Sequence, residues 1–300
     1  VLAANLIVIG QGPEFDPVGR CTGGQVFGRQ GAVGDDGVAV QVGIEDGHSR
    51  ILGAKPPPAL SAGQCPYHLG PAFERLQMIV VHHLNNSRSQ RVLWLLEELG
   101  LPYEIRRYER DRQSMLAPPE LRQVHPLGKS PVITDGGFTL AESGAIVEYL
   151  IEQHGAGRLI PAAGTPERQR YRYWLHYAEG SAMPPLLLKL VFDQIEKARM
   201  PWIARPIAKA ISAKTKSAFI LPSIRQHLDY MEAELAARDW FAGDEFSGAD
   251  IQMSFPLEAA AARGGLNASR PRLMDFLERI HARPAYQRAL EKGGPFTVAG

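Results

Sequence analysis

The chain has 300 residues, a hydrophobic fraction of 45% and a formal net charge of +1 at neutral pH. This length is sufficient for two domains, and the near-zero charge provides no long-range field that would favour nucleic acid as a partner. No run approaches the roughly 18 apolar residues that a membrane-spanning helix needs. We therefore expect a cytoplasmic protein without a membrane partner.

Residues 1–77 differ in composition from the rest of the chain. They hold 14 of the 30 glycines, a triple-proline run and both cysteines, Cys21 and Cys65. Because this segment lacks sustained helical periodicity, it would bury little apolar area to offset its ordering entropy. We expect a low-order extension, or upstream sequence read through from a mis-assigned start, with Met78 as the true first residue.

An α/β pattern extends from Met78 to residue 156. Apolar residues from Val92 to Leu99 recur at helical spacing, and Gly100 ends that helix. An Asp-Gly-Gly turn at residues 135–137 indicates a hairpin. The predicted strands are 78–82, 103–108, 130–134 and 138–141, and the predicted helices are 87–99, 118–124 and 143–154. The order β-α-β-α-β-β-α predicts one α/β domain.

After a linker at residues 155–164, the pattern is helical throughout. Thr165 and Pro166 suit the cap and first position of a long helix, which we expect to bend at Pro184 and Pro185. The sequence SGAD, residues 247–250, has the spacing of a capping box. The predicted helices are 165–192, 217–238, 247–263, 272–281 and 284–290. An all-helical domain over residues 165–297 is therefore expected.

Residues 197–219 are both basic and apolar, and no acidic residue occurs between Glu196 and Asp229. This segment could lie on a membrane surface, cover a substrate pocket, or connect helices in solvent. Because Pro201 and Pro206 should break a continuous amphipathic helix, the pattern favours a cover over the pocket.

Short polar residues, among them Asn86 and Ser87, stand where the first strand gives way to the first helix. A helix N-terminus offers partial positive charge and unpaired N–H groups, so these residues either cap the helix or help to hold an anion. The neighbouring His82 and His83 face opposite sides of a strand, and no metal site is expected there.

Five motifs in this order resemble the cytosolic glutathione transferase family. They are NNSRSQRVLWLLEELGLPYEI, HPLGKSPVI, LAESGAIVEYL, FSGADI and RPAYQRAL, and the resemblance covers residues 78–296. It is closest to bacterial and fungal members with Asn-Ser-Arg after the first strand, rather than to the tyrosine or cysteine classes. The resemblance implies an α/β thioredoxin-like N-terminal domain over residues 78–156, an all-α C-terminal helical domain over residues 165–297, and a homodimer.

The resemblance also implies glutathione as co-substrate, whose own thiol must be ionised. Ser87, or Asn86 one residue earlier, would stabilise the thiolate. Because the chain after Met78 contains no cysteine, mixed-disulfide chemistry is not expected at this position.

Four further residues acquire roles from the same resemblance. Ser143 would bind the γ-glutamyl carboxylate of glutathione and Glu142 the neighbouring ammonium. Pro131 would follow a cis peptide bond, and Ser130 would pair its backbone with the cysteinyl unit of glutathione. Lys129 would reach the glycine carboxylate. Taken singly, Ser143 could only cap its helix and Lys129 could be a solvated loop charge.

The activity that the resemblance implies is detoxification, in which the thiolate attacks a small hydrophobic electrophile or reduces organic hydroperoxides. Tyr173, Trp174, Tyr177 and Met183 are candidates for the electrophile site, although their helical spacing favours core or dimer contacts. The alternative function is a non-catalytic glutathione-binding scaffold or carrier with the same fold.

Overall fold

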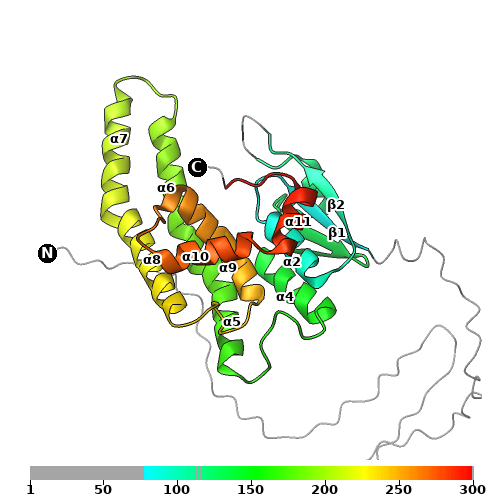
Figure 1. The fold of residues 1–300 in the computed structure, drawn as a ribbon. Coiled ribbons are helices and arrows are strands. Elements are labelled where there is room, and N and C mark those ends of the chain that lie inside the picture. The colour runs from blue at the N-terminus through cyan, green and yellow to red at the C-terminus, as the bar shows by residue number, and fades with distance from the viewer. Residues whose placement is uncertain (1–77, 112–113, 115, 299–300) are drawn as a thin grey trace, which may run out of the picture. The chain divides into compact units, whose positions relative to one another are not determined.

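The computed structural model describes residues 78–111, 114 and 116–298, so the expected extension over residues 1–77 lies outside the described residues. Four strands that form one sheet alternate with helices in the first part of the described chain, and only helices follow (Figure 1). The strands are β1 (Ile79–Leu84), β2 (Tyr103–Tyr108), β3 (Val132–Asp135) and β4 (Phe138–Ala141). Strand β1 pairs in parallel with β2 and antiparallel with β3, and β3 pairs antiparallel with β4, which gives the order β2-β1-β3-β4.

The helices of the α/β part are α2 (Ser89–Leu99), α3 (Glu120–Val124) and α4 (Ser143–His154). The predicted order β-α-β-α-β-β-α is therefore confirmed, and so is the hairpin turn at Gly136 and Gly137, which both have positive φ. Helix α2 begins two residues later than predicted, because Ser87 lies outside the helix and accepts the Ser89 N–H through its hydroxyl oxygen.

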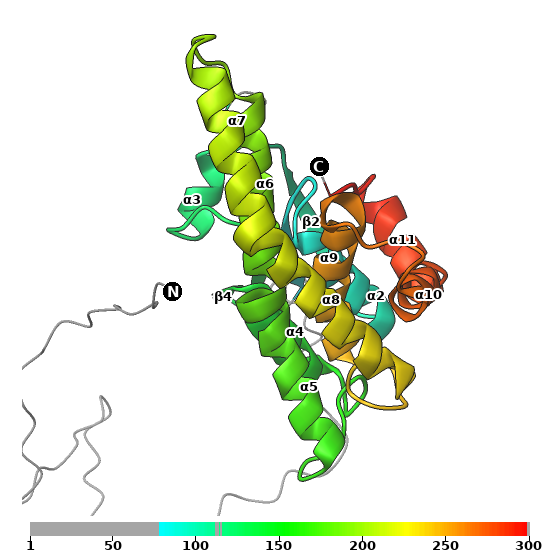
Figure 2. The same cartoon turned by 90° about the vertical axis from the view of Figure 1, so that its left-hand side faces the viewer.

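The remaining elements are all helical (Figure 2). They are α5 (Pro166–Tyr177), η1 (Ala178–Ala182), α6 (Met183–Lys197), α7 (Ala204–Thr215), η2 (Lys216–Ile220), α8 (Leu221–Ala236), α9 (Gly248–Ala259), η3 (Ala260–Gly264), α10 (Pro271–His281) and α11 (Pro284–Gly293). Figure 2 shows α7 and α8 continuing one another along a single rod.

Helix α7 contradicts the prediction that prolines interrupt this segment. Pro206 is the third residue of α7, in the first turn, where a backbone N–H has no acceptor inside the helix. Pro201 lies before the helix begins. Neither proline therefore removes a helical hydrogen bond from α7.

Wide π-helical turns precede prolines twice in the helical part. Turn η1 ends two residues before Pro184, and turn η2 ends two residues before Pro222. A proline ring collides with the carbonyl four residues earlier in an α-helix, and widening that turn relieves the contact. The irregularity predicted at Pro184 and Pro185 accordingly lies in η1, just before them.

Helix α9 is buried on nearly every side, and its first turn has the predicted capping box. Asp250 accepts hydrogen bonds from the backbone N–H groups of Phe241 (2.9 Å) and Ser247 (2.8 Å) and from the Ser247 hydroxyl (3.0 Å). Burial raises the pKa of Asp250 to about 6, although the hydrogen bonds from Phe241 and Ser247 oppose that rise. The capping box thus fixes where α9 enters the core.

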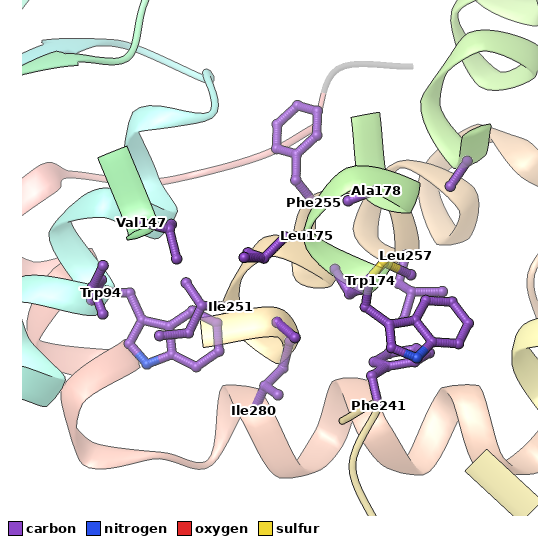
Figure 3. Close-up of a cluster of buried hydrophobic side chains, with 14 of the residues drawn as sticks. Trp94, Val147, Trp174, Leu175, Ala178, Phe241, Ile251, Phe255, Leu257 and Ile280 are labelled. Carbon is purple, nitrogen blue, oxygen red and sulfur yellow. The ribbon is translucent and has the colours of Figure 1, made fainter. Parts of the chain in front are cut away.

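Aromatic side chains from both parts of the chain pack in one core with α9. Trp94 of α2 packs edge-on against Tyr286 of α11, and Trp174 of α5 packs against Phe241. Figure 3 shows Ile251 of α9 beside Trp94, with Trp174 on the far side of the same core. One apolar core therefore joins the sheet-bearing part to the helical part. Within the described ranges no helix combines the length and apolar character needed to cross a bilayer.

Replacing Asp250 with Ala should lower the free energy of unfolding by about 3–5 kcal/mol, because two buried N–H groups lose their acceptor. Urea unfolding at neutral pH measures the loss. Thr165→Ala is the matched control: it removes a half-buried cap of α5 that accepts the Arg168 N–H and donates to the exposed Ala162 carbonyl, and it should cost about 1 kcal/mol. Equal losses in the two variants would contradict the structural role assigned to Asp250.

Candidate functional site

A cavity of about 490 Å³ lies where the C-terminal ends of β1 and β4 meet the helical part. Its walls come from the β1–α2 junction, the β2–α3 loop, residues 122–131, the β4–α4 junction, and the η1–α6 segment. Both parts of the chain therefore contribute to it.

Four of the predicted site residues line this one cavity: Lys129, Ser130, Glu142 and Ser143. They come from two segments that the sheet topology makes adjacent, because β3 and β4 pair next to one another. The Ser130–Pro131 peptide bond is cis, as the resemblance implied.

The junction between β4 and α4 is strained at the cavity wall. Glu142 has a φ of 70°, in the left-handed region that side chains other than glycine rarely adopt, at a cost of about 1–3 kcal/mol. Ser143 follows as the first residue of α4, and its hydroxyl accepts a 3.2 Å hydrogen bond from the Gln252 amide of α9. The helical part therefore holds Ser143 in place.

Ser87 lies behind Ser130 rather than on the cavity wall. Its side chain is 4% exposed, and its hydroxyl is 3.3 Å from that of Ser130. It is also 2.7 Å from the Ser89 hydroxyl, which in turn lies 2.8 Å from Nδ1 of His83. Ser87 is thus part of a chain of hydroxyl groups that reaches the cavity through Ser130.

Asn86 is directed elsewhere. Its amide oxygen accepts the backbone N–H of Thr297 at 3.1 Å, and its φ of 49° places it in the left-handed region that Asn tolerates. Its side chain therefore attaches the C-terminal segment to the turn between β1 and α2, and it does not line the cavity.

Sequence reasoning assigned no role to Arg88 and Glu179, which also line the cavity. The Arg88 Nε donates to Glu179 at 2.8 Å, and Arg91 forms a second ion pair with the same carboxylate. Burial opposes the charge of Glu179, but Arg91 and Arg88 outweigh it and lower its pKa. Arg88 stood in the quoted motif beside Ser87, whereas no sequence signal could connect it to a residue 91 positions away.

The lining is richer in cations than in carboxylates. The lining has a formal excess of two positive charges. Its cations are Arg88, Arg110, Arg122 and Lys129, and its carboxylates are Glu142 and Glu179. Burial and the nearby Arg88 lower the pKa of Arg110, so these two guanidinium groups share one region of the wall. The cavity suits a ligand with net negative charge.

A proline in α9 creates the contact beneath the cavity. Pro256 has no N–H, so the carbonyl of Gln252, four residues earlier, loses its helical donor. The guanidinium of Arg91, which is 2% exposed, donates to that carbonyl and to Glu179. Arg91 of α2 thus replaces a missing helical hydrogen bond and joins the two parts of the chain.

The electrophile candidates do not line this cavity. Trp174, Tyr177 and Met183 are buried in the core, while Tyr173 is exposed. Residues 197–219, which the sequence favoured as a cover over the pocket, do not line it either. Of helices α6 and α7, only α6 reaches the wall, through Leu187, so the predicted cover was wrong.

The two histidines bond to different neighbours. Nδ1 of His82 lies 2.9 Å from the Tyr108 hydroxyl, and Nε2 lies 3.2 Å from that of Thr134. His83 instead meets Ser89 of α2. Across the ranges that the structure describes, no group of three or more His, Cys, Asp or Glu side chains could hold a metal ion.

Comparison with known proteins identifies the family. One family profile, described as Glutathione S-transferase, N-terminal domain, matches residues 76–152, and another, Glutathione S-transferase, C-terminal domain, matches residues 196–284. Glutathione S-transferase 3 of Schizosaccharomyces pombe is 37% identical over 215 residues, or 72% of this chain and 88% of the relative. Glutathione S-transferase 1 of Saccharomyces cerevisiae is 33% identical over 225 residues, or 72% and 96%.

Solved structures agree with this assignment. A glutathione S-transferase from Actinobacillus pleuropneumoniae is 32% identical, with a TM-score of 0.56, over 72% of this chain and 93% of that one. A sphingomonad glutathione S-transferase complexed with glutathione is 27% identical, with a TM-score of 0.55, over 72% and 98%. The chain belongs to the glutathione S-transferase family, with a thioredoxin-like N-terminal domain and a helical C-terminal domain. The Asn-Ser-Arg subtype stays a prediction.

Arg91→Met should lower the free energy of unfolding by about 3–5 kcal/mol, because Glu179 and the Gln252 carbonyl both lose a buried partner. Pro256→Ala restores a backbone N–H opposite that carbonyl. We expect Pro256→Ala to stabilise the Arg91→Met protein by about 1 kcal/mol more than it stabilises the wild type. Urea unfolding of the four proteins measures this coupling, and simple additivity would contradict the proposed replacement.

Proposed function

We propose that this protein is a glutathione transferase that binds glutathione in the cavity and directs its thiolate at a small electrophile. The observation that carries the proposal is the meeting of Lys129, Ser130, Glu142 and Ser143 at one cavity, since these are the residues that family resemblance assigned to glutathione. Relatives named glutathione S-transferase, and the sphingomonad structure complexed with glutathione, support the same activity.

Charge complementarity supports glutathione as the ligand. With its thiol ionised, glutathione carries two carboxylates, one ammonium and one thiolate. The cavity lining has a formal excess of two positive charges, which matches the net charge of that anion. The cations that balance the thiolate are in place before glutathione arrives, which limits the reorganisation that binding requires.

The ends of glutathione would bind at opposite sides of the cavity. Ser143, at the N-terminus of the 12-residue helix α4, would hold the γ-glutamyl carboxylate with its hydroxyl and the first N–H groups of that helix. Glu142, exposed beside it, would pair with the ammonium. Ser130 would contact the cysteinyl backbone and Lys129 the glycine carboxylate.

The thiolate would lie near the N-terminus of α2. A free thiol has a pKa of roughly 8.5, and each unit by which the protein lowers it corresponds to about 1.4 kcal/mol. Three features favour the anion there: the partial positive charge of the helix N-terminus, the Arg88 guanidinium, and the Ser87 hydroxyl. Neither residue lines the cavity. Asn86 bonds to Thr297, whereas Ser87 reaches the cavity through its hydrogen bond to Ser130, so we favour Ser87 over Asn86 for this role.

The proton of the Ser87 hydroxyl has three possible acceptors: Ser89, Ser130 and the incoming sulfur. Two proton arrangements compete. If the Ser89 hydroxyl donates to Ser87, the Ser87 proton is directed to Ser130 or to the sulfur; if Ser89 donates to Nδ1 of His83, it can accept the Ser87 proton instead. Burial and the nearby Arg107 lower the pKa of His83, whereas a hydrogen bond to the Gly293 backbone raises it. That bond uses the ring nitrogen away from Ser89, which favours Nδ1 as an acceptor.

The electrophile would occupy the apolar side of the same cavity, where Leu116, Ala117 and Leu187 lie. Holding it beside a preformed thiolate supplies most of the rate through proximity and charge stabilisation. Reduction of organic hydroperoxides by the same thiolate is a second reaction of this site. We extend the proposal to a homodimer, which equilibrium sedimentation would test.

The functional test is retention on immobilised glutathione followed by assays with an aryl halide and an organic hydroperoxide. We expect retention together with turnover of at least one electrophile. Retention without turnover of either compound would favour the alternative, a glutathione-binding carrier or scaffold. Failure of calorimetry to detect glutathione binding by folded protein would defeat both functions.

Ser87→Ala should raise the pKa of the bound thiol by about one unit, because the thiolate loses a hydrogen-bond donor of about 1.4 kcal/mol. Titration of the thiolate absorbance in the presence of glutathione measures the shift. Asn86→Ala is the matched control and should leave this pKa unchanged, while loosening the C-terminal segment. The reverse pattern would move the role to Asn86.

Ser89→Ala distinguishes the two proton arrangements in the same titration. If Ser89 donates to Ser87, its removal leaves the Ser87 proton poorly oriented and raises the thiol pKa by less than Ser87→Ala does. A lowered thiol pKa in Ser89→Ala would show instead that Ser89 normally accepts the Ser87 proton. The thiolate would then depend on Arg88 and the backbone of α2.

A further inference from the structure

An apolar stripe on the α6–α7 hairpin takes no part in the cavity. Trp202 is 80% exposed, and Ile203, Ile207 and Ile211 are 58–63% exposed. Ile203, the helical N-cap residue of α7, is four residues from Ile207, as Ile207 is from Ile211, so the three share one face. Ser212 of the same helix is fully buried, which shows that a different face packs against the protein. We call Trp202 and these isoleucines the isoleucine stripe.

Single exposed apolar residues are ordinary, but a row of three exposed isoleucines with an exposed tryptophan at its start indicates a binding surface. The stripe lies near the free end of the hairpin. Figures 1 and 2 both show the joined ends of α6 and α7 projecting beyond α9 and α10. A flat partner could therefore reach it without meeting the rest of the helical part.

The hairpin is also strongly basic. Its cations from residue 189 to residue 219 are Lys189, Lys197, Arg199, Arg205, Lys209, Lys214 and Lys216. These seven stand against two acids in the same range, Asp193 and Glu196, which leaves five positive charges. Both acids pair with Lys216 at 2.8 Å. Helix α7 contains no acidic residue, and its exposed cations are Arg205, Lys209 and Lys214.

Apolar and basic side chains together favour one kind of partner. A second copy of the chain that packed its own stripe against this one would bring like charges together across a two-fold axis. An anionic lipid surface complements both features, because acyl chains accept the apolar side chains and the headgroups accept the cations. We propose that residues 197–219 bind peripherally to anionic phospholipid bilayers, with the isoleucine stripe inserted at the boundary between headgroups and acyl chains.

Helix α7 suits such a position. Its 12 residues are helical without interruption, since Pro206 is in the first turn, and they give a length of about 18 Å that can lie flat. Lys209 and Lys214 have flexible stems that let their charges reach the phosphates while the isoleucines are buried. A short helix of this kind attaches to the surface and does not span the bilayer.

A consequence for catalysis rests on the proposed function. Leu187, on the helix that forms the other half of the hairpin, lines the cavity, so a bound protein would have its electrophile site close to the bilayer. Hydrophobic electrophiles concentrate in lipid and would reach the cavity from there. Vesicle binding itself needs no turnover. A protein that bound vesicles but did not conjugate would overturn the proposed function and leave this inference intact.

The test is cosedimentation of the full chain with phosphatidylcholine vesicles, with and without phosphatidylserine. We expect binding only when phosphatidylserine is present, weakening as salt is added. Trp94 and Trp174 are fully buried and Trp240 is half-buried, whereas Trp202 is exposed, so tryptophan emission should shift to the blue on binding. Trp202→Phe should abolish most of that shift and retain binding.

Two double variants separate the two contributions. Ile207→Asn with Ile211→Asn, and separately Lys209→Glu with Lys214→Glu, should each weaken vesicle binding at least about tenfold, equivalent to about 1.4 kcal/mol. Arg172→Glu with Arg272→Glu makes the same charge change at exposed sites on α5 and α10 and should leave binding nearly unchanged. Conjugation in vesicle-free buffer should be the same in all variants.

Three results would overturn the inference. One is absence of cosedimentation with phosphatidylserine vesicles by the wild type. Another is an equal loss in the Arg172 and Arg272 control. The third is conversion of a dimer to a monomer by the isoleucine variant when the Lys→Glu variant binds vesicles normally, which would assign the stripe to a subunit contact. The Lys→Glu variant alters only exposed side chains and carries the test if the isoleucine variant does not fold.

Discussion

The buried guanidinium of Arg91 is the contact on which the arrangement of this protein depends. Pro256 deprives the Gln252 carbonyl of its helical donor, and Arg91 of α2 supplies the replacement while pairing with Glu179. A guanidinium removed from water needs several acceptors at once, and the junction of α2, η1 and α9 offers Arg91 the Gln252 carbonyl and the Glu179 carboxylate. The sheet-bearing domain and the helical domain are therefore held in one relative position by a charge that neither could accommodate alone.

Contacts at that junction fix the positions of two residues that line the cavity. Glu179, which pairs with Arg91, also accepts a hydrogen bond from Arg88. Gln252, whose carbonyl accepts from Arg91, donates from its side chain to Ser143. Two helix N-termini, those of α2 and α4, border the same space, and both favour anions. The strained backbone at Glu142 is fixed on its C-terminal side, where the Glu142 carbonyl accepts the Ile146 N–H and the Ser143 hydroxyl accepts from Gln252. A site for an anionic tripeptide thus follows from how the domains meet.

The hairpin of α6 and α7 has two different surfaces. Its inner side contributes Leu187 to the cavity, and its outer side presents apolar and basic side chains that the core does not use. Prolines mark this region without breaking it, since Pro206 lies in a first turn and Pro184 follows a widened one. A proline in the first turn of a helix leaves the helix intact, whereas a proline in the helix interior breaks or kinks it.

Local physics determined much of this protein from sequence alone. Strands β2 and β4, helix α4 and the capping box at Ser247 and Asp250 follow from periodicity and turn chemistry, which act over a few residues. The family and its fold follow from five ordered motifs. Only the tertiary structure decided that Ser87 lies behind Ser130, that Asn86 holds the C-terminal segment, and that Arg88 meets Glu179. Those contacts join residues 43, 211 and 91 positions apart, and their partners are chosen by packing and desolvation, which no local pattern records.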